Sequence, residues 1–264
     1  GDPVNLTCKV AQDLDDLRAP VLAECASCVP LFLNEYNAVA STNFLNGGTA
    51  TVDGNGGTAS DPAFGRVLGN GGNWLELVTT VDGLDLRGAQ LEWRENKTGG
   101  TSGSITLRSD VGALASLPAG TIITFIEKNA VSGGRNTDLS LNAATGDNWI
   151  NIYSRDAAVV AASTSTKVGA TFGSFTTSND NWVLTVKDAS GTIIAPPAGE
   201  GSLGYWHGSV DSTDVCRLEQ DPSGRITGCS IMDDTGRFST FGKANTWADC
   251  PDGGTVHTQD FSAL

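Results

Sequence analysis

Two glutamates are the first side chains in this sequence that could do chemistry. Glu35 lies in the run Leu31-Phe-Leu-Asn-Glu-Tyr36, and Glu76 lies in the run Trp74-Leu-Glu-Leu. Glycosidases use two carboxyl groups that are held at a defined separation on either side of a cleft. The two glutamates are therefore a candidate catalytic pair. A structural role is the alternative, because a carboxylate in a strand also accepts hydrogen bonds from backbone N–H groups or from arginine.

The tripeptide Tyr205-Trp206-His207, which glycines flank, is the second candidate. Aromatic side chains offer a flat surface with a polar edge, and histidine can ligate a metal or transfer a proton near neutral pH. We expect these three residues to form a ligand-binding surface. A metal-dependent hydrolase that also uses His257 is the alternative, whereas the Gly-x-Ser-x-Gly motif of a serine hydrolase does not occur in the sequence.

Oxygen-bearing side chains recur in the glycine-rich stretch 46–73. Asp53, Asn55 and Asp61 supply the kinds of oxygen that Ca²⁺ prefers, although the stretch lacks the terminal bidentate glutamate of a complete calcium loop. An ordinary cluster of Gly/Asn turns is the alternative. A connection this long without secondary structure is uncommon, so we expect a functional loop or one held by packing or an ion. No cofactor other than a structural Ca²⁺ is expected.

Six cysteines gather at the two ends of the chain. An even number in an acidic, lysine-poor chain predicts disulfides formed outside the cytoplasm. Cys25-Ala-Ser-Cys28 lacks the second pair of ligands that a zinc site needs. Cys216 and Cys229 flank the turn signal Pro222-Ser-Gly224 and are the pair we favour. At least one further bond is expected to tie the N-terminal segment to the C-terminal one. The six are Cys8, Cys25, Cys28, Cys216, Cys229 and Cys250.

Composition narrows the class of protein. The 264 residues include 16 Lys+Arg and 30 Asp+Glu, a net charge of −14, which argues against a nucleic-acid partner. The 33 glycines favour many short strands joined by turns. No run approaches the roughly 20 apolar residues that span a bilayer, and the lack of a basic, apolar leader predicts a mature secreted protein. Asn5-Leu-Thr7 and Asn96-Lys-Thr98 match the N-glycosylation pattern.

Eight short runs rich in β-branched or aromatic residues predict strands, and Gly, Asn, Asp or Pro bound each run. This pattern is typical of a β-sandwich rather than of βαβ units. Three runs begin with an Asn-Trp pair, at Trp74, Trp149 and Trp182, where we expect the indole to cover the end of the core rather than to stack on a sugar. The runs are Leu31–Tyr36, Trp74–Thr79, Gln90–Trp93, Ser104–Leu107, Thr121–Ile126, Trp149–Tyr153, Trp182–Val186 and Thr192–Ile194.

Five segments of the sequence follow one another in a recognisable order. They are Leu31-Phe-Leu-Asn-Glu35-Tyr, Gly72-Asn-Trp74-Leu-Glu76-Leu, Leu84-Asp-Leu86-Arg-Gly88-Ala-Gln-Leu91, Leu117-Pro118-Ala-Gly120-Thr-Ile-Ile-Thr-Phe125 and Ser239-Thr-Phe-Gly242-Lys-Ala-Asn245-Thr-Trp247. Together, over roughly residues 31–247, they resemble the lamin-tail domain family. The family pattern is an apolar strand with a glutamate, a Trp-(Ile/Leu)-Glu-Leu strand, a leucine- and glycine-containing turn, a Leu-Pro-Ala-Gly turn, and a closing Ser-x-x-Gly-x-(Pro/Ala)-Asn segment.

The resemblance implies an all-β, immunoglobulin-like β-sandwich over residues 31–247. Residues 1–30 are then a disulfide-tethered arm, 46–73 a long glycine-rich insertion, and 248–264 a segment tied back to the domain. The resemblance also places Glu35 and Glu76 on neighbouring strands, where Arg87 or Arg66 are expected partners, and so favours their structural role. We therefore expect a secreted or cell-surface module that binds an extracellular protein or a glycan and does no chemistry. A self-associating subunit of an extracellular assembly is the alternative.

Overall fold

The computed structural model describes residues 29–39, 72–127, 140–142, 148–201, 210–212, 214–219, 240–248 and 256–264. These residues form twelve strands and two short 3₁₀ helices. Neither helix is long or apolar enough to cross a membrane. The strands are β1 (Leu31–Asn37), β2 (Trp74–Thr79), β3 (Gln90–Glu95), β4 (Ser102–Leu107), β5 (Ile122–Ile126), β6 (Trp149–Tyr153), β7 (Val160–Ser165), β8 (Trp182–Lys187), β9 (Ile193–Ala198), β10 (Val215–Arg217), β11 (Thr246–Ala248) and β12 (Val256–Thr258), and the helices are η3 (Gly112–Leu114) and η5 (Phe261–Ala263).

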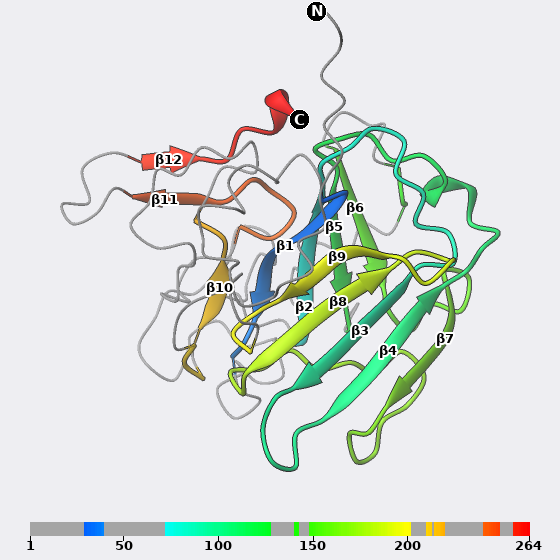
Figure 1. Cartoon of the computed structure of the whole chain (residues 1–264), viewed down its shortest axis with the longest axis vertical. Helices are drawn as coiled ribbons and strands as arrows, with labels where there is room; N and C mark the ends of the chain where they lie inside the picture. The colour runs from blue at the N-terminus through cyan, green and yellow to red at the C-terminus, as the bar shows by residue number, and fades with distance from the viewer. Residues whose placement is uncertain are drawn as a thin grey trace, which may run out of the picture.

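Two five-stranded sheets pack against each other as a sandwich (Figure 1). The first sheet has the order β10-β1-β2-β5-β6 and the second has the order β7-β4-β3-β8-β9, while β11 and β12 form a separate pair. All neighbours are antiparallel except β5 and β6. Each of the eight predicted runs overlaps a strand, and the prediction of an all-β sandwich is confirmed. The strands β7, β10, β11 and β12 were not predicted.

Large aromatic side chains are buried on both faces of the first sheet. Tyr36 on β1 and Trp182 on β8 bring the sheets together, with 4.7 Å between their ring centroids. Trp74 and Trp149 instead pack against Phe241 on the other face of the first sheet. All three indoles are buried, which confirms that they belong to the core. Asn181 just before β8 has a φ of 53°, a left-handed conformation that asparagine tolerates better than most residues. In the Asn181-Trp182 pair, the asparagine therefore forms the turn and the tryptophan packs in the core.

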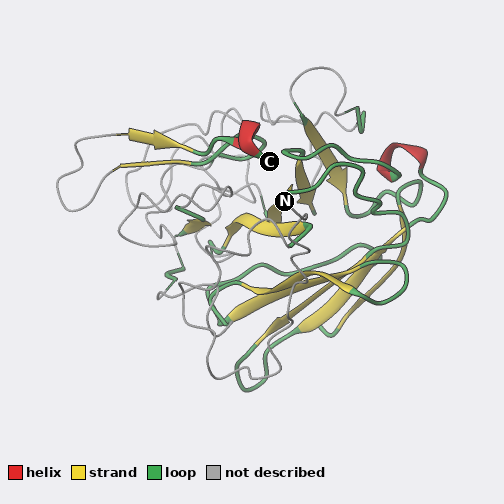
Figure 2. Ribbon diagram, turned by 45° about the horizontal axis from the view of Figure 1, so that its top comes forward, coloured by secondary structure: helices red, strands yellow, loops and turns green. Residues whose placement is uncertain are grey.

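The strands β1 and β2 are buried on both faces rather than on one. Leu75 pairs with Tyr36 and faces the second sheet, so Trp74 and Glu76 face the opposite way. That outer face is covered by residues 240–248 and 256–264, which we call the C-terminal layer. Phe241 of this layer packs edge-on against Trp74, with 5.1 Å between ring centroids. Figure 2 shows the C-terminal strands and η5 (red) lying away from the second sheet.

Candidate functional site

The two candidate catalytic glutamates are direct cross-strand partners on β1 and β2. Both side chains are completely buried. Leu33 pairs with Leu77 and Glu35 pairs with Glu76, so Asn34 is an extra residue in β1, a β-bulge. Without the bulge, the two-residue period would turn Glu35 into the apolar space between the sheets. The bulge therefore places both carboxyl groups on the same outer face.

The glutamate pair belongs to a row of polar side chains that crosses the first sheet. Arg217 on β10 lies beside Glu35, and Thr124 and Asn151 continue the row from Glu76 across β5 and β6. All five residues are buried. The Thr124 hydroxyl donates to Asn151 Oδ1 at 2.9 Å. Because the C-terminal layer covers much of this face, these groups need protein partners in place of water.

Main-chain N–H groups of the C-terminal layer bind directly to the two carboxyl groups. Thr240 donates its N–H to Glu35 at 3.0 Å, and its hydroxyl lies 2.8 Å from Glu35 Oε2. Gly242 donates its N–H to Glu76 Oε2 at 2.7 Å, while Asn34 Nδ2 donates to Glu76 Oε1 at 2.8 Å. The carboxyl pair thus holds the chain at residues 240–242 against the sheet.

A set of side-chain amides reinforces the same attachment. Asn245 Nδ2 donates to the carbonyl oxygens of Asn34 at 3.0 Å and Leu218 at 3.1 Å. Gln259 Nε2 donates to Asn34 Oδ1 at 2.6 Å, and Gln259 Oε1 accepts the N–H of Asn245 at 2.8 Å. Three parts of the chain that are far apart in sequence therefore meet at the bulge in β1.

The surroundings of the Glu35–Glu76 pair favour the protonated form of Glu76. Burial and then the charge of Glu35 raise the pKa of Glu76 well above its ordinary value, whereas hydrogen bonds from Asn34 and Gly242 lower it. Two carboxyl groups this close titrate as one unit. Catalytic carboxyl pairs also share a proton, but they face a cleft that admits substrate. The complete burial of Glu35 and Glu76 supports a structural role instead.

The predicted partners of the glutamates need a correction. Arg87 does not contact either glutamate: its guanidinium forms a 2.7 Å ion pair with Asp85, and both side chains are partly exposed. This pairing is local because the two residues are two positions apart. Arg66 lies outside the described residues. The main-chain donors that the sequence analysis missed are in the Ser239-to-Trp247 segment, which was noted only for its resemblance to a family motif.

Several other predicted site residues lie outside the part of the chain that the structure describes. His257 is described and stacks on Trp247, with 5.8 Å between the ring centroids. The described residues contain no group of three or more His, Cys, Asp or Glu side chains that could hold a metal. The ligand-binding and calcium-binding predictions therefore stay predictions. The residues outside the description are Tyr205, Trp206, His207, Asp53, Asn55 and Asp61.

The disulfide prediction also concerns residues that are mostly not described. Cys216 lies in β10 and is buried. Its predicted partner Cys229 is outside the described residues, so this pairing stays a prediction.

Asn96, one of the two glycosylation candidates, is exposed beside the turn between β3 and β4, whereas Asn5 is not described.

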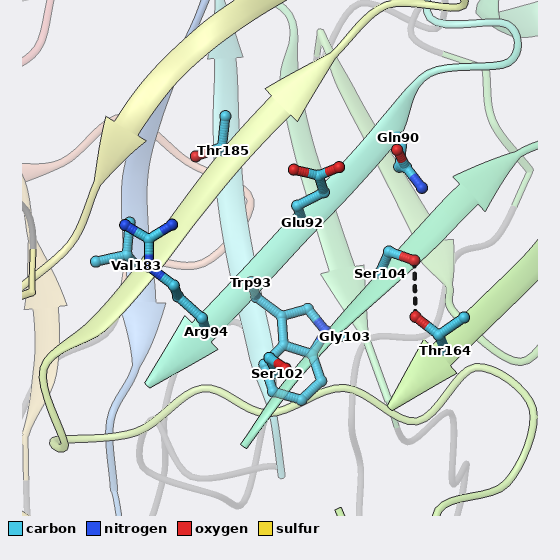
Figure 3. A pocket seen from close by; sticks show the side chains of 10 residues that line it. All are labelled: Gln90, Glu92, Trp93, Arg94, Ser102, Gly103, Ser104, Thr164, Val183 and Thr185. Carbon is cyan, nitrogen blue, oxygen red and sulfur yellow. Dashed lines mark hydrogen bonds between the residues drawn. The ribbon is translucent and has the colours of Figure 1, made fainter. Parts of the chain in front are cut away.

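A second candidate site is a shallow depression on the outward face of the second sheet, which we call the trough. Its volume is about 340 Å³, and β3, β4, β7 and β8 all line it (Figure 3). Two contacts cross between the strands at this face. Lys187 Nζ donates to Glu92 at 2.7 Å, and the hydroxyls of Ser104 and Thr164 are 2.9 Å apart. The lining residues are Gln90, Glu92, Trp93, Arg94, Ser102, Gly103, Ser104, Thr164, Val183 and Thr185.

Three polar side chains of the trough retain unused hydrogen-bonding groups. Thr185 is only 8% exposed, and its hydroxyl has no hydrogen-bond partner among the described residues. The side-chain amide of Gln90 is likewise without a partner in this part of the chain. Arg94 uses Nε to bind Asn96 at 2.8 Å, and no described residue binds its terminal amino groups. The trough therefore offers donors and acceptors to a ligand.

Comparisons with protein-family models, with curated proteins and with solved structures found no significant match. The function is therefore inferred from the side chains and contacts described above.

Proposed function

We propose that this protein is an extracellular β-sandwich module that binds a protein partner or a glycan and is not an enzyme. One observation carries the proposal: the predicted catalytic pair, Glu35 and Glu76, is completely buried and bound to the chain at Thr240 and Gly242. A substrate would have to displace the C-terminal layer to reach either carboxyl group. Polar side chains that a ligand can reach line the trough on the open outer face of the second sheet.

We further propose an immunoglobulin-like sandwich of the lamin-tail type. Support comes from the structural roles of the motif residues in this chain. Glu35 and Glu76 of the strand motifs bind Thr240 and Gly242 of the closing motif, and Asn245 binds the bulge in β1. These contacts give a physical reason why the two strand motifs and the closing motif occur in one sequence. The extracellular location rests on the cysteine pattern and the acidic composition.

A self-assembling subunit is less well supported, because both edges of the second sheet carry features that hinder strand addition. At one edge, β9 contains Pro196 and Pro197, which have no N–H to donate to a further strand. At the other edge, β7 is irregular at Ala161, where the pairing with β4 shifts by one residue. Both features favour a module that does not extend its sheet.

A hydrolysis assay tests the absence of catalysis. The wild-type protein, Glu35→Gln and Glu76→Gln are incubated with a panel of glycosides, and released reducing sugar is measured. We expect no turnover above the buffer blank for any of the three proteins. Turnover by the wild type that disappears in both variants, at a temperature where circular dichroism shows them folded, would contradict the proposal.

A further inference from the structure

The outward face of the second sheet is polar at the trough, and its strands are paired on both sides of β3. In β3, the side chains alternate, with Leu91 and Trp93 buried and Glu92 and Arg94 turned outward. The neighbouring strands hold these positions in register, since Glu92 pairs with both Ser104 and Thr185. The backbone of a central strand cannot move without breaking this pairing. The pairing therefore fixes the points from which these side chains leave the sheet.

Thr185 brings a hydroxyl group to the trough. This hydroxyl has no hydrogen-bond partner among the described residues, although the rest of the residue is largely buried. The amide of Gln90 and the terminal amino groups of Arg94, which no described residue binds, border the same depression. Together they place a hydroxyl, an amide and a guanidinium around one small volume.

The chemistry of these groups selects the class of ligand. A hydroxyl-rich ligand can donate to the amide oxygen of Gln90 and accept from Arg94, because each sugar hydroxyl both donates and accepts. An apolar ligand would find little surface, since Trp93 and Val183 are 3% and 1% exposed. A polyanion is disfavoured by the net charge of −14. The carboxylate of Glu92 is already paired with a lysine.

We propose that the trough is a glycan-binding site, with Thr185, Gln90 and Arg94 as the side chains that contact the sugar. This inference rests on the proposed binding function and names its ligand class. The volume of about 340 Å³ is at the lower end for ligand pockets, which fits one or two sugar units at a time. The open shape of a sheet face leaves room for a longer chain to continue on either side.

Two pairs of matched variants test the site on the full chain. Thr185→Val removes the hydroxyl and keeps a β-branched side chain; its control is Thr106→Val, the same change on the same face outside the trough. Arg94→Ala removes the guanidinium; its control is Arg108→Ala, because Arg108 is also exposed and also binds a residue two positions away. A glycan array identifies ligands, and isothermal titration then measures Kd for each variant.

The expected result is that the wild type binds at least one glycan, and that Thr185→Val and Arg94→Ala each raise Kd about tenfold or more. The two controls should stay within about twofold of the wild type. Trp206→Ala separates the trough from the predicted aromatic site. If only Trp206→Ala loses glycan binding, the trough is excluded and the binding function stands. If the folded wild type binds no glycan at millimolar concentration, the glycan proposal fails and a protein ligand remains for the proposed function.

Discussion

Replacing Gly242 by alanine is expected to lower the free energy of unfolding by about 2–5 kcal/mol. Gly242 has a φ of +73°, a left-handed conformation that costs a residue with a side chain about 1–2 kcal/mol. A Cβ atom at this position would also lie 2.8 Å from Cε2 of the buried Trp149 ring. Relieving that overlap must move either the Trp149 ring or the main chain whose N–H binds Glu76. Urea denaturation followed by fluorescence measures the loss.

Gly99 provides a matched control for this prediction. It has the same φ of +73°, but a Cβ atom added there would meet nothing within 4 Å. Gly99→Ala should therefore show only the conformational cost of about 1–2 kcal/mol. The difference between the two variants measures how closely the C-terminal layer packs against the first sheet. Equal losses in the two variants would mean that residue 242 does not contact Trp149 in solution.

The stability of the protein is expected to fall as pH rises from 5 to 8. Burial and the neighbouring Glu35 raise the pKa of Glu76 in the folded chain, so the folded state binds more protons than the unfolded state. The stabilisation is fully present below the unfolded-state pKa and is lost as pH rises through the folded-state pKa. Between the unfolded-state and folded-state pKa values, the free energy of unfolding falls by up to about 1.4 kcal/mol per pH unit, which is the slope for one proton.

Two exposed aspartates change the stability with pH in the opposite direction, but they do so outside the range from pH 5 to 8. A hydrogen bond from Arg87 lowers the pKa of Asp85, and a hydrogen bond from Arg108 does the same for Asp110. These two groups add stability above their unfolded-state pKa and lose it only as pH falls through their folded-state pKa. Their titration lies below pH 5, so these two aspartates do not add to the pH dependence between 5 and 8.

Glu76→Gln isolates the contribution of the buried carboxyl group. Its amide nitrogen would face either Asn34 Nδ2 or the Gly242 N–H, so we expect a loss of about 1–3 kcal/mol at pH 5. The advantage of the wild type over this variant should then shrink as pH rises. Glu92→Gln, on the other sheet, is the control. An advantage that stays constant from pH 5 to 8 would show that the buried pair ionises normally.

The strands could be predicted from the sequence because β-branched and aromatic runs between turn residues are a local signal. Strand β7, Val160–Ser165, was missed because alanine, serine and threonine at a sheet edge need little apolar character. Strands β10, β11 and β12 have three residues each, too short for a periodic pattern. Their pairing is decided by tertiary contacts instead.

The candidate site was predicted in part. The resemblance placed Glu35 and Glu76 side by side, and the structure does the same. Their donors were missed because Thr240 is 205 residues from Glu35, and because a bulge at Asn34 decides which face Glu35 occupies. No local pattern reports either fact. The trough was missed because a residue such as Thr185 in an alternating strand looks like any other half-buried position.

Hydrogen exchange at the N–H groups of Thr240 and Gly242 tests most directly whether Glu35 and Glu76 hold the C-terminal layer in place. Both groups donate to completely buried carboxyl oxygens. We predict that they exchange as slowly as the N–H groups of β2, and that Glu76→Gln speeds exchange at Gly242 more than in β2. Exchange at Gly242 as fast as in the exposed turn at Gly99 would contradict the structural role of the pair.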